Sequence, residues 1–109
     1  MSRHLTHLEH RGRRITVVAG YDRPLRSLFL QVLYADLPPW EDEQFLYASL
    51  DDPSADWTDI NTVAGKLDAL GIAVPADMLE GIFLDQCLNT GNLVVEHHDD
   101  RPPTVLTVG

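Results

Sequence analysis

The stretch Leu-Arg-Ser-Leu-Phe-Leu-Gln-Val-Leu-Tyr-Ala, residues 25–35, decides the fold because its side chains alternate as they do on a β-strand. One face of this strand is wholly apolar and consists of Leu28, Leu30, Val32 and Tyr34. The opposite face is mixed and consists of Ser27, Phe29, Gln31 and Leu33. This combination is typical of an antiparallel sheet with one side on the core, so we expect the first set to be buried.

Strand signals lie on both sides of this segment. Residues 14–19 form a β-branched run, and Gly20, Asp22 and Pro24 predict a turn that follows it. Residues 45–50 predict a third strand that returns as a hairpin, after a Pro-containing loop over residues 36–44. Residues 93–97 predict a fourth strand and residues 104–108 a fifth. Residues 1–12 alternate poorly, so we expect them to be irregular or to form a short extra strand.

Two helices are expected between the third and fourth strands. The first has an apolar stripe at helical spacing, formed by Ile60, Val63, Ala64, Leu67 and Leu70. Asp56 or Thr58 is expected to cap its start, and Gly71 to end it. We expect Gly65, inside this helix, to permit close approach to the sheet. The second helix is expected to start at Pro75 and to bury a stripe formed by Leu79, Ile82, Phe83, Gln86 and Cys87.

These elements predict an α+β fold with two helices packed on one face of an antiparallel sheet. The sheet is expected to have four to five strands in the order β-β-β-α-α-β, with residues 104–108 as a further terminal strand. A chain of 109 residues suits a single domain, residues 1–109. Hydrophobic residues make up 44% of the chain and charged residues 23%, which excludes a disordered tail.

Apolar runs in the chain fall far short of the roughly 20 residues that span a bilayer. The segment from Met1 to Arg14 lacks the apolar stretch of a signal peptide. The only cysteine is Cys87, which excludes an intrachain disulfide. We therefore expect a cytoplasmic protein without membrane contact, in which Cys87 is a buried structural thiol.

Charge is distributed unevenly along the chain, whose formal net charge is -9. Six of the eight basic residues lie in residues 1–26, whereas only Lys66 and Arg101 oppose the acidic residues that follow. The cluster Arg11, Arg13 and Arg14 has two open interpretations: a small phosphate-binding patch, or pairing with the acidic part of this chain or of a second copy. Direct nucleic-acid binding is not expected from a chain this acidic.

Acidic residues gather with two tryptophans in the middle of the chain. We predict that this region binds a protein partner with a basic surface, through Trp40, Glu41, Asp42, Glu43, Asp51, Asp52, Asp56, Trp57 and Asp59. The alternative is a solvated acidic surface that aids solubility. Exposed loops with prolines do not favour paired catalytic carboxylates, and the spacing of a Ca²⁺ loop is absent from the sequence.

Histidines lie near both ends of the sequence, at His4, His7, His10, His97 and His98. If the terminal segments lie side by side, several imidazoles would meet and could bind a transition metal. Their spacing matches no recognised zinc motif, so we expect solvated side chains, no metal and no cofactor.

The sequence therefore predicts a small, non-enzymatic protein-binding module. A specific form is an inhibitor from a phage or mobile element that occupies a basic nucleic-acid-binding site on a host defence complex. The alternatives are a homo-oligomeric accessory protein, with apolar helix residues at a dimer interface, and a His-based metal protein.

Overall fold

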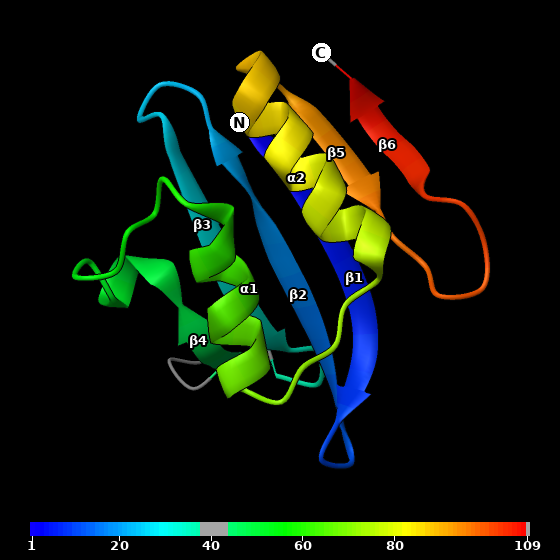
Figure 1. The fold of residues 1–109 in the computed structure, drawn as a ribbon. Helices are drawn as coiled ribbons and strands as arrows, with labels where there is room; N and C mark the ends of the chain where they lie inside the picture. Colours follow the sequence, from blue (N-terminus) through cyan, green and yellow to red (C-terminus); the bar gives the residue numbers. More distant parts are fainter. Residues whose placement is uncertain (38–43, 109) are drawn as a thin grey trace.

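A mixed six-stranded sheet carries both α-helices on one of its faces (Figure 1). The computed structural model describes residues 1–37 and 44–108. In chain order the strands are β1 (Ser2–His10), β2 (Arg13–Asp22), β3 (Ser27–Tyr34), β4 (Phe45–Ala48), β5 (Leu93–Glu96) and β6 (Thr104–Val108). The helical segments are the 3-10 turn η2 (Ser49–Asp51), α1 (Ile60–Ala69) and α2 (Ala76–Leu88). The α+β class and the helices on one face, both expected from the sequence, are confirmed.

The strand order β4-β3-β2-β1-β5-β6 corrects the expected sheet of four to five antiparallel strands. The described sheet has six strands, and β1 pairs with β5 in parallel. The remaining neighbours pair antiparallel. The parallel pair arises because the chain leaves the β4 edge, crosses one face through α1 and α2, and returns beside β1 (Figure 1).

Strand β1 is the element that the sequence least revealed, because its buried face is polar. Ser2, His4 and Thr6 are all buried on the side that faces the helices. Ser2 Oγ accepts a hydrogen bond from the Tyr21 amide at 3.1 Å, and Thr6 Oγ1 donates to the His97 carbonyl at 3.0 Å. The segment is therefore a regular strand without an apolar alternation, which explains why an irregular or short segment was expected.

The hydrocarbon core lies between the centre of the sheet and the two helices. Leu28, Leu30 and Val32 are buried, as expected for the apolar face of β3. Opposite them, the helices bury Val63, Leu67, Met78 and Ile82. Burial of such side chains stabilises each contact by roughly 1.5–3 kcal/mol relative to exposure.

The start of α1 differs from the expectation. Asp59, rather than Asp56 or Thr58, is the cap, and its carboxylate accepts from the Asn61 amide at 2.9 Å. Gly71 has a φ of +72° just after the helix, as expected. Gly65 is exposed, so close approach to the sheet was wrongly expected there.

The buried side of α2 also differs from the expected stripe. Met78, Ile82 and Asp85 are buried, whereas Phe83 is 46% exposed and Cys87 is exposed. Asp85 bonds to a histidine beneath the helix, and this polar contact turns α2 away from the orientation that hydrophobicity alone predicts. Cys87 is therefore not the buried thiol that we expected.

Candidate functional site

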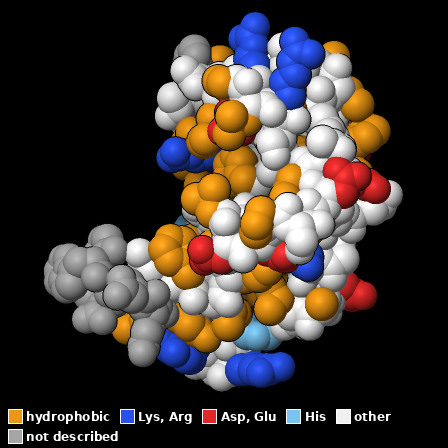
Figure 2. Space-filling model, turned by 90° about the vertical axis from the view of Figure 1, so that its left-hand side faces the viewer, with side chains coloured by type: hydrophobic (Ala, Val, Ile, Leu, Met, Phe, Trp, Pro, Cys, Tyr) orange, Lys and Arg blue, Asp and Glu red, His pale blue; other side chains and the backbone are white. Residues whose placement is uncertain are grey.

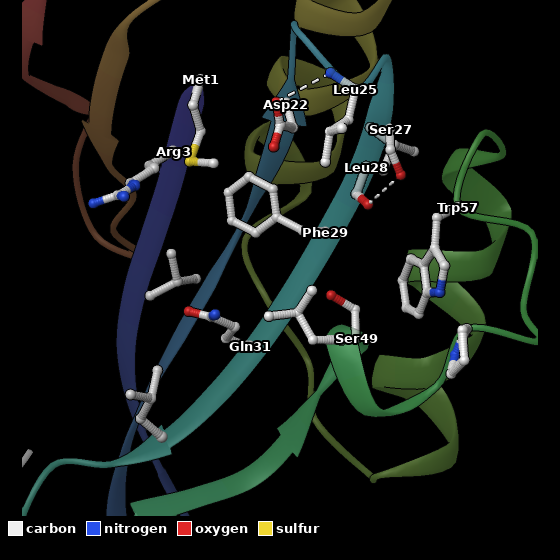
Figure 3. A pocket seen from close by; sticks show the side chains of 14 residues that line it. Met1, Arg3, Asp22, Leu25, Ser27, Leu28, Phe29, Gln31, Ser49 and Trp57 are labelled. Carbon is white, nitrogen blue, oxygen red and sulfur yellow. Dashed lines mark hydrogen bonds between the residues drawn. The ribbon is translucent and has the colours of Figure 1, made fainter. Parts of the chain in front are cut away.

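The face of the sheet opposite the helices is hollowed into a groove of about 640 Å³ (Figure 3). Its floor comes from the mixed face of β3 and from β2, with the side chains Phe29, Gln31, Leu33 and Val18. Its ends and rim come from Met1, Leu25, Leu50, Pro53 and Trp57. Seen from the β4 edge, hydrophobic side chains gather around the hollow, with Lys and Arg side chains projecting at both ends of the molecule (Figure 2).

The rim of the groove is fixed to β3 by hydrogen bonds beyond the end of β4. The Leu30 amide donates to Ser49 Oγ at 3.1 Å, and the Leu28 amide donates to the Trp57 carbonyl at 2.7 Å. The indole of Trp57 donates to the Asp52 carbonyl at 2.8 Å. These bonds hold the segment 49–57 as a wall, so the groove is preformed.

Two exposed leucines flank this groove. Leu25 is 73% exposed at one end, and Leu50 is 84% exposed on the wall. A leucine gains roughly 2 kcal/mol from full burial, so a partner that covers either side chain is favoured. An apolar hollow with exposed leucines at its rim is typical of an interaction site.

Few polar groups enter the groove. The Gln31 amide lies among the lining side chains and has no hydrogen-bond partner within residues 1–37 and 44–108 (Figure 3). The Asp22 carboxylate lies at the end near Leu25, whose amide donates to it at 3.3 Å. The side chain of Arg3 points away from Phe29 (Figure 3). The groove thus offers apolar contact, one free amide and one carboxylate.

Several acidic residues expected to bind a partner also have roles within the chain. Asp52 accepts from the Tyr47 hydroxyl at 2.8 Å and forms an ion pair with Lys66 at 2.9 Å. The bond from Lys66 holds the pKa of Asp52 below its usual value, and burial with the bond to Asp52 raises the pKa of Tyr47 to about 12. Hydrogen bonds from Thr58 lower the pKa of Asp56.

The remaining members of that set are dispersed. Asp59 caps α1, whereas Asp51 is exposed and has no hydrogen bond or ion pair with another described residue. Acidic side chains visible from the β4 edge stand in separate small groups (Figure 2). Trp40, Glu41, Asp42 and Glu43 lie outside the described residues. Binding of a partner through this set stays a prediction.

The expected arginine cluster makes one defined contact. Arg13 forms an ion pair with Asp36 at 3.0 Å, and its guanidinium lies 3.7 Å from the centre of the Tyr34 ring. Arg11 and Arg14 have no ion pair among the residues that the structure describes. The cluster therefore does not pair with the described acidic residues at positions 51–59.

Beneath α2, two of the five histidines form a buried hydrogen-bonded chain with two aspartates. Asp85 Oδ2 is 2.5 Å from His4 Nε2, and His4 Nδ1 is 2.7 Å from His97 Nε2. His97 Nδ1 is 3.1 Å from Asp77 Oδ1. Both histidines are 3% exposed, whereas the Asp77 side chain is 44% exposed, so the chain runs from the interior to the surface.

Each of the four ring nitrogens of this chain faces a hydrogen-bond partner, and which of them donates depends on the tautomer of each ring. The chain ends inside the protein at the buried Asp85 carboxylate and near the surface at Asp77.

The hydrogen bonds of this chain join β1 and the residue after β5 to α2. No set of three histidine, cysteine, aspartate or glutamate side chains in the described residues has an arrangement that could hold a metal ion. His7 lies against Thr16, and His98 against Thr104, away from the pair. Burial, the largest cause, lowers the pKa of His97.

The expectation of solvated histidines is wrong for His4 and His97, which are buried, and sequence reasoning missed both aspartates that bond to them. A usable signal was Asp85, which stands three positions after Ile82, on the side of the helix that should be apolar. A second signal was Gly81, where a Cβ atom would lie 2.9 Å from His4 Cε1. A small residue is needed there because His4 fills the space below the helix.

Comparison with protein-family models, with curated proteins and with solved structures found no match. Neither α1 nor α2, the α-helices within residues 1–37 and 44–108, has the length and hydropathy needed to cross a membrane.

Proposed function

We propose that this chain is a protein-binding module that takes an apolar segment with basic flanks from another protein into the groove. The observation that carries this proposal is the preformed apolar hollow with Leu25 and Leu50 exposed at its rim. The groove has a volume within the usual range for bound side chains or ligands, about 300–1,000 Å³. The apolar hollow and the exposed leucines of this face favour binding rather than catalysis.

Charge favours a basic partner over an acidic one. The chain has a formal net charge of -9. Asp22 lies at one end of the groove, and the exposed Asp51 directly follows Leu50 on the wall. An acidic setting accelerates encounter with a basic partner, and added salt weakens that effect. An inhibitor that occupies a basic nucleic-acid-binding surface of another protein is one case of this module.

A displayed peptide library tests the proposal with defined probes. It would hold three classes of equal size: apolar and basic, apolar and acidic, and polar and basic peptides. We expect enrichment of the apolar basic class, with affinity that falls as salt is added. Leu50→Ser should weaken binding about tenfold, the effect of losing roughly 1.4 kcal/mol of apolar contact.

Leu88→Ser is the matched control, because Leu88 is 74% exposed on α2 and does not line the groove. Its peptide binding should equal that of the unchanged chain. Enrichment of no class, or of acidic peptides, would overturn the proposal. So would equal losses in Leu50→Ser and Leu88→Ser, since the binding surface would then lie elsewhere.

A further inference from the structure

The hairpin formed by β5 and β6 is held to the rest of the sheet by few buried side chains. Strand β5 buries one residue, Val95, and every residue of β6 is exposed. The hairpin joins the sheet where β5 pairs with β1 over four positions. Elements with few buried apolar side chains open locally at a lower free energy than the core. We therefore expect this hairpin to open before the central strands β2 and β3 do.

His97, which directly follows β5, makes buried side-chain bonds between this hairpin and the rest of the protein. Its Nε2 lies 2.7 Å from His4 Nδ1 on β1, and its Nδ1 lies 3.1 Å from Asp77 Oδ1 on α2. The His97 amide donates to the Leu5 carbonyl at 2.8 Å, and the His97 carbonyl accepts from Thr6 Oγ1 at 3.0 Å. A change that separates the two imidazoles thus acts at the joint between the hairpin and β1.

The bond between the two imidazoles cannot survive full protonation of both rings. A bond between two ring nitrogens needs a hydrogen on one of them and a lone pair on the other. A fully protonated imidazole donates from both of its nitrogens, so two such rings would point N–H groups at each other. Both side chains are buried, so solvent screens the repulsion between the two positive charges only weakly.

The charged groups around the pair do not remove this conflict. On α2, Asp85 and Asp77 face the outer nitrogens of the two rings, where they favour positive charge but leave the inner bond unsatisfied. Burial, the largest cause, lowers the pKa of His97, and the neighbouring His98 lowers it further. His97 also borders a polar hollow of about 500 Å³, through which solvent protons can reach it. The other titratable groups of this hollow are His7, Glu96, Asp99, Asp100 and Arg101.

We propose that His4 and His97 form an acid-sensitive latch that releases the β5–β6 hairpin from β1. The latch is closed while at least one of the two facing nitrogens lacks a proton. When both rings are protonated, the hairpin moves away with His97 and both imidazolium groups reach water. Histidines exposed in this way take up protons near pH 6.5, so each pH unit below about 6.5 should raise the open population about tenfold for each extra proton bound. This gain ends where the closed form takes up the same proton.

Hydrogen exchange of the full chain, at about pH 7 and about pH 5.5, tests the latch once each rate is divided by its intrinsic rate at that pH. The amides that join β5 to β1, with that of His97, should lose about tenfold in protection at the lower pH. Their exchange should be faster than that of the β2–β3 amides and nearly independent of low urea, because local opening exposes little surface.

Two variants and a matched control assign the effect to the pair. His97→Gln and, separately, His4→Gln each leave one imidazole in the latch, so both should lose most of the tenfold pH effect. His98→Gln changes the next residue, which bonds to Thr104, and should retain it. Circular dichroism would establish that each variant is folded, and the use of two variants keeps the test valid if one of them is not.

Equal protection of the β1–β5 amides at both pH values overturns the proposal. So does exchange of these amides at the rate and urea dependence of the β2–β3 amides, since the whole protein would then unfold together. Retention of the full pH effect in His97→Gln and His4→Gln, or its loss in His98→Gln, also overturns it. Peptide binding in the groove can succeed or fail independently of these outcomes.

Discussion

The two faces of this sheet are built from alternate residues of the same strands. They differ in whether their polar side chains are hydrogen bonded and their apolar side chains are buried. On the face under the helices, even the polar side chains His4, His97 and Asp85 are hydrogen bonded. No buried side-chain nitrogen or oxygen atom among the described residues lacks a partner. On the other face, Gln31 has no such partner within residues 1–37 and 44–108, and Leu50 is exposed. This difference indicates that one face maintains the fold and the other is available for binding.

The largest effect should follow from breaking the buried chain at one end. His4→Leu leaves the buried Asp85 carboxylate without its nearest partner, which should lower the free energy of unfolding by about 3 kcal/mol. The double variant His4→Leu/Asp85→Leu removes both polar partners and should be more stable than His4→Leu. Urea denaturation of the two variants measures both values. A double variant that is the less stable of the two would contradict the idea that the unpartnered Asp85 carboxylate causes the loss.

A smaller effect should follow from one methyl group on α2. Gly81→Ala places a Cβ atom against the ring of His4, which cannot move because both of its nitrogens are bonded. We expect a loss of about 1–2 kcal/mol, despite the better helix propensity of alanine. Gly65→Ala in α1 is the control, since its Cβ would meet nothing within 4 Å. Gly65→Ala should stabilise the protein by up to about 1 kcal/mol. Thermal denaturation of the two variants measures the difference between them.

The pH dependence of stability should report on His97. Burial lowers its pKa in the folded chain below the ordinary value of about 6.5, so between these two values the unfolded chain binds the proton more tightly. The free energy of unfolding should therefore fall as the pH drops below about 6.5, whereas above this pH His97 adds no dependence. The groups that face it are His4, Asp77 and, more distantly, His98. Histidine NMR titration together with urea denaturation measures this effect.

His97→Gln should remove most of this pH dependence, and His98→Gln should retain it. His98 follows directly in the sequence but bonds to Thr104 rather than to the buried chain. Stability that rises as the pH falls from 7 to 5 in the unchanged protein would contradict the lowered pKa.

The smallest effect on stability is expected on the open face. Leu50→Ser changes a side chain that is 84% exposed, so the free energy of unfolding should move by no more than about 0.5 kcal/mol. The same substitution should weaken peptide binding about tenfold, as proposed above. Thermal denaturation beside a binding titration would separate the two effects. A large loss of stability would mean that the rim holds the fold.

Sequence patterns predicted the elements whose burial is hydrophobic. The apolar face of β3 and the core positions Val63 and Leu67 of α1 were correctly expected. The spacing of apolar residues along a strand or a helix indicates which side chains are buried. Strand β1 was left open between an irregular segment and a short extra strand, because His4 and Thr6 are buried through partners 81 to 93 positions away in the sequence. Such bonds leave no local periodicity.

The candidate site was predictable only in part, for a related reason. Trp57 was singled out from composition, but the groove also needs Phe29 and Gln31 from β3 and Val18 from β2. These side chains form one surface only after β2 and β3 pair in their observed register. The sequence shows that these side chains are partly polar and partly apolar. It does not show that residues 49–57 form a wall that encloses them.

We propose that the open face, rather than the helix-covered face, binds a partner. An NMR titration of the full chain with an apolar, basic peptide would show which face binds. We predict chemical-shift changes at the amides of Val18, Phe29, Gln31 and Leu50, with those of α2 unchanged. Changes confined to α2 and β6, or an absence of changes at saturating peptide, would contradict it.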